Sequence, residues 1–133
     1  MKPLLVDTGP LVALHNRRDP DHERCRAVTA RRLGVLRTTW PAVAECMYLL
    51  GRFPASQIQL LELIRAGRLE VAEIGDLLER IAAFMTKYSD VPMDFTDATL
   101  VAVAERDRLT EIFTLDNDFS IYRIGRRALT VVP

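Results

Sequence analysis

Four acidic residues have the type and the placement to do chemistry together, because each stands close to the end of an expected strand or in an expected helix. They are Asp7, Glu45, Asp97 and Asp116. Two carboxylates about 4 Å apart repel by roughly 4 kcal/mol at an effective dielectric near 20, so a cluster of them needs protons or cations. Oxygen ligands alone favour magnesium or manganese over zinc. We therefore expect Mg2+, with Mn2+ as the alternative, and hydrolysis of a phosphodiester as the reaction.

Taken singly, these acids have simpler interpretations. Glu45 can face solvent, as most single acids on helices do, although its neighbours are mostly apolar. Asp94 can cap a helix, and Asp97, three residues later, can then face the positive end of that helix. Asp116 and Asp118 fall in a segment rich in turn-forming residues. Capping and metal binding are compatible for Asp97, so the simpler interpretations do not exclude a shared site.

The elements that must position these acids alternate along the chain. Short apolar runs predict strands, and helix-period patterns that open near proline and stop at glycine predict helices. The expected strands are residues 4–6, 35–39, 69–74, 112–115 and 129–132, and the expected helices are 11–15, 19–33, 42–50, 54–67, 76–88 and 94–108, with a turn or short helix at 118–122. This alternation predicts an α/β fold of three layers (α/β/α), with a mainly parallel sheet between the helices.

The carboxyl ends of the strands are where such a fold binds its ligands. Asp7 directly follows the first expected strand, and Asp116 directly follows the strand at 112–115. Asp97 lies in the first turn of a helix, and Glu45 lies in the helix after the second strand. We therefore expect the four carboxylates to converge on one crevice.

The composition of the chain fits one domain, residues 1–133, and excludes several classes of protein. Apolar residues make up 49% of the sequence, and 18 basic residues balance 18 acidic ones. Binding of a nucleic acid would therefore require a local basic patch. No apolar run is long enough to span a membrane, and an acid close behind the first apolar run argues against a signal peptide. Cys25 and Cys46 lack metal-binding spacing, which favours buried free thiols in a cytoplasmic protein.

Other catalytic motifs fit the sequence less well. The triplet Asp7-Thr8-Gly9 also occurs in aspartic proteases, but that fold is almost all β and helix patterns dominate this chain. His15 and His22 have no partner at metal-ligand spacing, and we expect them on the surface or in loops. The sequence has no serine nucleophile elbow, no HExxH motif and no phosphate-binding P-loop.

Four segments of the chain resemble the motifs of PIN-domain nucleases, in the order that the family has them. They are residues 6–14, 39–50, 88–101 and 113–123. The resemblance implies that the metal-binding acids of the family correspond to Asp7, Glu45, Asp97 and Asp116. It also implies supporting roles for four neighbouring polar residues, carboxylates beside the ligands and hydroxyls that support water at the metal: Asp94, Asp118, Thr8 and Thr114.

Within this family, a chain of this length is similar to the VapC-type toxins of toxin–antitoxin systems. The likeness implies a cytoplasmic homodimer that cleaves RNA and pairs with a cognate antitoxin, a segment of which enters the acidic groove. We expect Asp7, Asp97 and Asp116 to hold the metal, while Glu45 completes the site or orients the attacking water. The alternatives are a PIN-fold RNA-processing nuclease outside such systems and a non-catalytic docking module that binds a basic segment.

Arginine is concentrated near the start of the chain. Residues 1–37 carry eight basic groups and four acidic ones, and 16 of the 18 basic residues in the whole chain are arginine. Arginine suits phosphate recognition, so Arg17, Arg18 and Arg24 are candidates to contact the RNA backbone outside the groove. A solvated helix face explains the same residues equally well.

Overall fold

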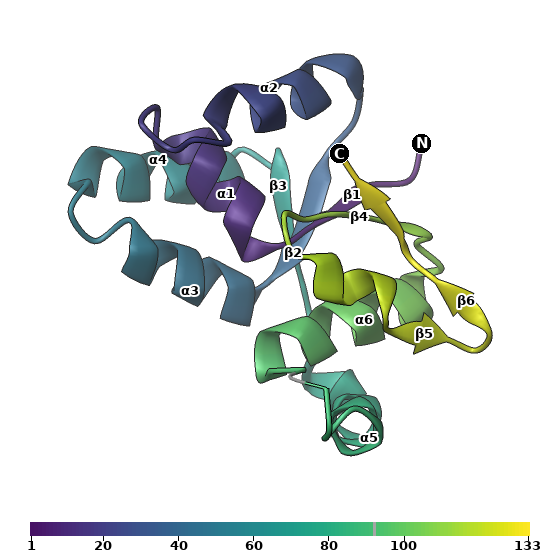
Figure 1. The fold of residues 1–133 in the computed structure, drawn as a ribbon. Helices are drawn as coiled ribbons and strands as arrows, with labels where there is room; N and C mark the ends of the chain where they lie inside the picture. Colours follow the sequence, from purple (N-terminus) through teal and green to yellow (C-terminus); the bar gives the residue numbers. More distant parts are fainter. Residues whose placement is uncertain (92) are drawn as a thin grey trace.

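A parallel sheet of five strands forms the centre of the structure, a computed structural model that describes residues 1–91 and 93–133 (Figure 1). The strands are β1 (Leu4–Val6), β2 (Leu36–Thr39), β3 (Leu69–Ala72), β4 (Glu111–Phe113) and β7 (Thr130–Val132). They lie in the order β3-β2-β1-β4-β7, and every neighbouring pair is parallel. The chain moves outward from β1 to β3 and then returns to the other side of β1. The strand order therefore reverses between β1 and β4, where folds of this class bind ligands.

Helices cover both faces of this sheet (Figure 1). On one face pack α1 (Thr8–His15), α2 (His22–Arg31), α3 (Trp40–Leu49) and α4 (Pro54–Arg65), and on the other pack α5 (Leu78–Lys87) and α6 (Phe95–Asp107). The strands divide the core accordingly, because successive side chains of a strand point to opposite faces. Leu4 and Val6 join the core cluster under α1 to α4, whereas Leu5 joins the cluster under α5 and α6. The three-layer α/β/α fold expected from the sequence is confirmed.

Several boundaries differ from the expected ones for local reasons. α1 begins at Thr8, not at residue 11, because the Asp7 side chain accepts a hydrogen bond from the Thr8 amide and caps the helix. β3 ends at Ala72, because the chain then turns into the short 3-10 helix η1 (Gly75–Leu77) ahead of α5. The expected helix at 94–108 is α6, with Asp94 as its N-cap.

A small hairpin near the end of the chain was not predicted. After the 3-10 helix η2 (Asn117–Ser120), β5 (Arg123–Ile124) pairs antiparallel with β6 (Arg127–Ala128). Each strand has only two residues, too few for an alternating pattern to be recognised in the sequence. Gly125 at the turn has a φ of 62°, a conformation that favours glycine.

Both cysteines and both histidines are buried, which was expected for the cysteines only. Cys25 and Cys46 are buried and free, as expected. The surface placement expected for His15 and His22 was wrong, because both are buried and each ring Nδ1 lies against a main-chain carbonyl of α1, at 2.8 and 2.6 Å. Among the described residues, we find no helix with both the length and the apolar character needed to cross a membrane.

Candidate metal centre

Asp7 is fixed at the point where the strand order reverses. Its amide donates to the carbonyl of Phe113 on β4 at 2.9 Å, so its main chain continues the sheet. Its Oδ1 accepts from the Thr8 amide at 2.7 Å, and its Oδ2 accepts from the Thr114 hydroxyl at 2.9 Å. With only 7% of the residue exposed, the carboxylate is held in one orientation at the base of the site.

Asp116 reaches the same place from the loop after β4. The Thr114 hydroxyl, which donates to Asp7, also accepts from the Asp116 amide at 3.0 Å, so one threonine connects the two acids. Oδ1 of Asp116 accepts from the Asp118 amide at 2.9 Å and thereby caps η2. Asp116 is exposed, which places it at the solvent side of the site.

Asp97 approaches from the opposite side, in the first turn of α6. Its amide donates to Oδ1 of Asp94, the N-cap of the helix, at 2.8 Å. Its Oδ2 accepts from the Tyr122 hydroxyl at 2.9 Å, and the residue is only 8% exposed. Capping and site formation are therefore divided between two residues, with Asp94 capping and Asp97 facing the other acids.

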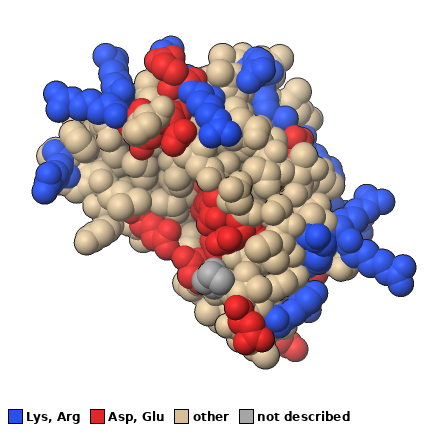
Figure 2. Space-filling view, viewed as in Figure 1, with Lys and Arg blue, Asp and Glu red and all other residues tan. Residues whose placement is uncertain are grey.

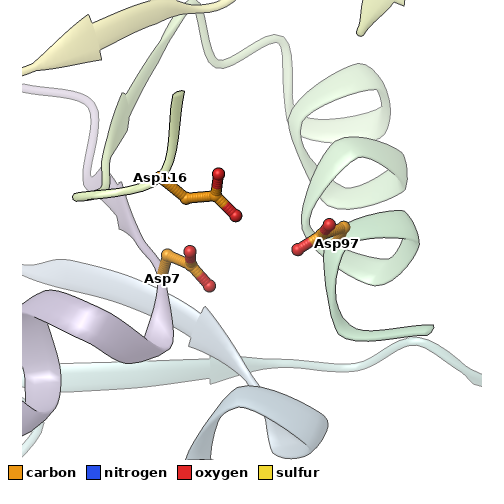
Figure 3. Close-up of side chains that lie close together, drawn as sticks. All are labelled: Asp7, Asp97 and Asp116. Atoms are coloured by element: carbon orange, nitrogen blue, oxygen red, sulfur yellow. The ribbon is translucent and has the colours of Figure 1, made fainter. Parts of the chain in front are cut away.

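The side chains of these three aspartates converge (Figure 3). One carboxylate oxygen from each of Asp7, Asp97 and Asp116 lies within 4.8 Å of the others. The space-filling view shows acidic side chains gathered in a recess near the middle of this face, with most lysines and arginines toward its margins (Figure 2). The sequence placed the three residues 90 and 19 positions apart along the chain. The fold brings them together because two follow neighbouring strands and the third opens a helix beside them.

Burial and neighbouring negative charges raise the pKa values of two of these three acids. Burial, the largest cause, raises the pKa of Asp7 to about 6, with the negative charges of Asp116 and Glu45 adding to it against the hydrogen bonds from Thr8 and Thr114. Burial likewise raises the pKa of Asp97 to about 7, helped by Asp94, Asp7 and Asp116 and opposed by the bond from Tyr122.

No arginine or lysine offsets these charges within the described part of the chain. None of its ion pairs includes Asp7, Asp97 or Asp116. The donor set consists of carboxylate oxygens, which suits a hard divalent cation such as magnesium or manganese better than zinc. The residues present therefore fit the metal expected from the sequence.

Glu45 stands beside this cluster and is not one of the three converging acids. It projects from α3, and its two carboxylate oxygens accept from two threonine hydroxyls, Oε2 from Thr8 at 3.0 Å and Oε1 from Thr96 at 2.7 Å. Its charge contributes to the raised pKa of Asp7, so it lies within electrostatic reach of the site. An exposed glutamate held by two hydroxyls can orient a polar group beside the three aspartates.

The remaining predicted residues lie around the cluster. The Thr8 and Thr114 hydroxyls both donate to carboxylates, to Glu45 and Asp7 respectively. Asp118 is half-buried. Burial and the bond to Asp97 are the main causes that raise the pKa of the Tyr122 phenol, and the charge of Asp118 adds to them. The three candidate RNA-binding arginines are exposed and lie outside the recess, two in the turn between α1 and α2 and one on α2, where it pairs with Asp21 at 3.7 Å: Arg17, Arg18 and Arg24.

Two residues that touch the acids were not singled out from the sequence. Thr96 directly precedes Asp97, and its position in the first turn of α6 places its hydroxyl beside Glu45. Tyr122 falls within the last segment that resembles the family, but no local pattern indicates that its hydroxyl reaches Asp97, 25 residues earlier. Both contacts depend on how elements pack, which residue spacing alone does not predict.

Comparison with known proteins agrees with the family expected from the sequence and with the fold. The model of the PIN domain matches residues 4–125, nearly the whole chain, and the chain belongs to the PIN domain family. Within that family it is similar to Ribonuclease VapC26 of Mycobacterium tuberculosis (strain ATCC 25618 / H37Rv), with 31% identity over 135 residues that cover 98% of this chain and 100% of the relative.

Two solved structures share the fold. One is the crystal structure of Mycobacterium tuberculosis VapC20, described as a sarcin-ricin loop cleaving toxin, with a TM-score of 0.82, 23% identity and coverage of 94% of this chain and 98% of that one. The other is a toxin–antitoxin complex from Klebsiella pneumoniae, with a TM-score of 0.70, 21% identity and coverage of 98% and 96%. At these identities the likeness concerns the fold.

Proposed function

We propose that the protein is a magnesium-dependent endoribonuclease that hydrolyses RNA phosphodiester bonds and acts as the toxin of a toxin–antitoxin pair. The observation that carries the proposal is the meeting of three aspartate carboxylates within 4.8 Å, at the reversal of strand order and without a compensating cation among the described residues. The relative named as a ribonuclease, matched over its whole length, supports RNA as the substrate.

Each acid has a distinct part in the proposed reaction. Asp7, Asp97 and Asp116 would hold one or two Mg2+ ions, with Mn2+ as a substitute. A divalent cation bound there supplies electrostatic stabilisation of the scissile phosphate and of the charge that develops during hydrolysis. Glu45, fixed by the Thr8 and Thr96 hydroxyls, would accept a hydrogen bond from the attacking water and direct it at phosphorus. The Thr114 hydroxyl and the Asp94 cap hold the aspartates in place, and Asp118 supports the loop of Asp116.

Binding of the RNA backbone would take place outside the recess. The recess is acidic and repels phosphates until cations occupy it, so affinity must come from basic groups elsewhere. Arg17, Arg18 and Arg24 are exposed on the segment that follows α1 and on α2, and we assign them to contacts with phosphates.

The proposed partners follow from the site and the relatives. A cognate antitoxin would place a basic segment against the acidic recess, and the structural similarity to a toxin–antitoxin complex supports this pairing. A homodimer is expected because α3 exposes large apolar side chains, with Trp40 49% and Tyr48 84% exposed. We take residues 1–133 as a single domain that works in the cytoplasm. Light scattering during size-exclusion chromatography tests the dimer directly.

The activity is tested with purified protein, freed of any co-purifying partner, and a panel of structured and single-stranded RNAs. Each RNA is incubated with Mg2+, with Mn2+ and with EDTA. The same panel is run with Asp97→Asn, which keeps the size and shape of the side chain but removes its charge. We expect cleavage that requires the metal and is lost in the variant.

The other results separate the alternatives. Metal binding without cleavage of any RNA in the panel would restrict the activity to a narrow target outside the panel. Absence of both metal binding and cleavage would contradict the nuclease and favour a docking surface for a basic protein segment. A nuclease without a neighbouring antitoxin gene would favour RNA processing over toxicity.

A further inference from the structure

A buried tyrosine outside the predicted set contacts the acidic site. Tyr122 is 1% exposed, and its hydroxyl donates to Oδ2 of Asp97 at 2.9 Å. Asp97 has a second constraint in its own main chain, because its amide donates to the Asp94 cap. The main chain of Asp97 is therefore fixed at the start of its own helix, and its carboxylate is held by a side chain from near the end of the chain.

The tyrosine is itself held rigidly by its surroundings. Its ring packs at an angle against those of Tyr88, with centroids 5.2 Å apart, and Phe119, with centroids 5.4 Å apart. The next residue, Arg123, anchors the main chain: its amide donates to the Tyr88 hydroxyl at 2.7 Å, and its guanidinium donates to the carbonyl of Ser120 at 2.6 Å. The position of the Tyr122 hydroxyl is thus set by the core and not by an exposed loop.

The same segment carries another of the three acids. Asp116 caps η2 at the beginning of this segment, and Tyr122 follows shortly after the end of η2. One compact piece of chain, residues 116–122, therefore contributes one carboxylate to the site and holds a second by a hydrogen bond. This arrangement fixes the position of Asp97 relative to Asp116.

We infer that Tyr122 is a positioning residue of the metal site: its hydroxyl orients the Asp97 carboxylate so that Asp97 and Asp116 bind a divalent cation together. The inference rests on the proposed function and adds a residue to its machinery. Loss of a hydrogen-bonding partner behind a metal ligand generally costs 10–100-fold in metal affinity or activity. We expect a loss in that range when only the Tyr122 hydroxyl is removed.

The chain offers a matched control for a merely structural role. Tyr122→Phe removes the bond to Asp97 and keeps the ring. Tyr88→Phe removes a hydroxyl from the same aromatic cluster. Among the described residues, the Tyr88 hydroxyl contacts the main-chain amide of Arg123 and no acid of the site. Both variants lose one hydroxyl group and keep their aromatic rings. If Tyr122 only supports the core, the two variants should behave alike in metal binding.

The experiment measures Mn2+ binding to the full chain by the loss of the free-ion paramagnetic resonance signal, with circular dichroism to verify folding. We expect Tyr122→Phe to weaken Mn2+ binding by about 10–100-fold and Tyr88→Phe to leave it within twofold of the parent. In the Asp97→Asn background, Tyr122→Phe should have no further effect, because its action runs through Asp97. For cleavage, the variant should need more metal while its KM for RNA stays unchanged.

Equal Mn2+ affinities in the parent and Tyr122→Phe would overturn the inference, as would an equal loss in Tyr88→Phe. A parent protein that binds no Mn2+ would overturn both this inference and the proposed function. A parent that binds Mn2+ but cleaves no RNA of the panel would restrict the activity to a target outside the panel, and the comparison of metal affinities would still decide the role of Tyr122.

Discussion

The two ends of α6 carry the same kind of side chain in opposite surroundings. At the first turn, Asp97 faces other carboxylates, and burial raises its pKa to about 7. At the last residue, Asp107 accepts hydrogen bonds from Arg106 at 2.9 Å and from Arg37 at 3.0 Å. The bond from Arg106 is the main cause that holds the pKa of Asp107 below its usual value, against a smaller opposing effect of burial.

The helix dipole alone would lower the pKa of Asp97 and raise the pKa of Asp107, because it favours a negative charge at the N-terminus of a helix and disfavours one at the C-terminus. Burial at Asp97 and the bond from Arg106 at Asp107 therefore outweigh the dipole. Asp107 is satisfied by arginines of the same chain, and Arg37 extends the network to Glu70 on β3 at 2.6 Å. Asp97 is left with like charges. A buried carboxylate that no described arginine or lysine neutralises is available for an external cation. On this difference we base the distinction between a proposed functional end of α6, at Asp97, and a structural end, at Asp107.

The largest effect is expected when the charge at the functional end is removed. Asp97→Asn should eliminate measurable cleavage, because one of three ligands loses its charge. The same change should raise the free energy of unfolding at pH 7 by about 1–3 kcal/mol, since it relieves repulsion in a buried cluster. RNA cleavage and urea unfolding, both measured without and with Mg2+, test the two parts. A variant that cleaves normally would show that α6 has no functional end.

The second prediction concerns pH in the absence of metal. Asp7 and Asp97 have folded-state pKa values of about 6 and about 7, above the ordinary 3.8, so the folded protein binds more protons than the unfolded chain between these values. Their contribution to stability is therefore complete below about pH 4 and is lost as the pH rises to about 7. Raising one such pKa from 3.8 to about 6 corresponds to roughly 3 kcal/mol.

Unfolding curves recorded with EDTA from pH 4.5 to pH 8 measure this loss, and Mg2+ should restore stability at the upper end. Asp107 should act in the opposite sense, since its lowered pKa adds stability that is lost only as the pH falls below about 4. Asp97→Asn should reduce the change in the free energy of unfolding between pH 5 and pH 7. Stability that rises with pH over this range in the metal-free protein would contradict the uncompensated cluster.

A third prediction tests the structural end of α6. Asp107→Asn removes a charged acceptor that Arg106 and Arg37 share, and leaves each of them, partly buried, with its other acidic partner alone. We expect the free energy of unfolding to fall by about 1–3 kcal/mol, the usual cost of a lost charge-assisted hydrogen bond. Cleavage by the folded fraction should be unchanged, because Asp107 lies at the far end of the helix. Chemical unfolding and initial cleavage rates separate these effects. A lower rate of RNA cleavage by the folded Asp107→Asn protein would contradict the distinction between the two ends of α6.

The sequence predicted much of this arrangement but not all of it. The α/β/α fold and the approach of Asp7, Asp97 and Asp116 followed from strand ends and a helix start, because parallel strands end at one edge of the sheet. The assignment of metal-binding roles to these residues stays a prediction. Asp97 and Asp107 look alike in the sequence, since each is an aspartate near a helix end, and only the packing of β2 against α6 brings Arg37 to one of them.

Contacts between distant side chains were beyond prediction for the same reason. Thr8 and Thr96 reach Glu45 from two different helices, and Tyr122 reaches Asp97 across the site. Each contact depends on the path of a loop or the rotation of a helix, which a pattern of apolar residues determines only coarsely.

The smallest expected effect extends the comparison from aspartates to arginines. Arg37 and Arg106 neutralise acids of the protein itself, whereas Arg17 is exposed and assigned to phosphate. Arg17→Gln should weaken RNA binding by less than about tenfold for every sequence tested. Because about one phosphate contact is lost, the slope of log K against log salt concentration should change by about 0.7 for single-stranded RNA. Filter binding of an uncleaved RNA to the Asp97→Asn protein, over a range of salt concentrations, measures both quantities. Arg65→Gln is the matched control, because Arg65 is also exposed but pairs with Glu62 on α4 at 2.6 Å. An equal loss in both variants would mean that the arginines of the surface attract RNA by charge alone, and the segment between α1 and α2 would then have no special part in binding it.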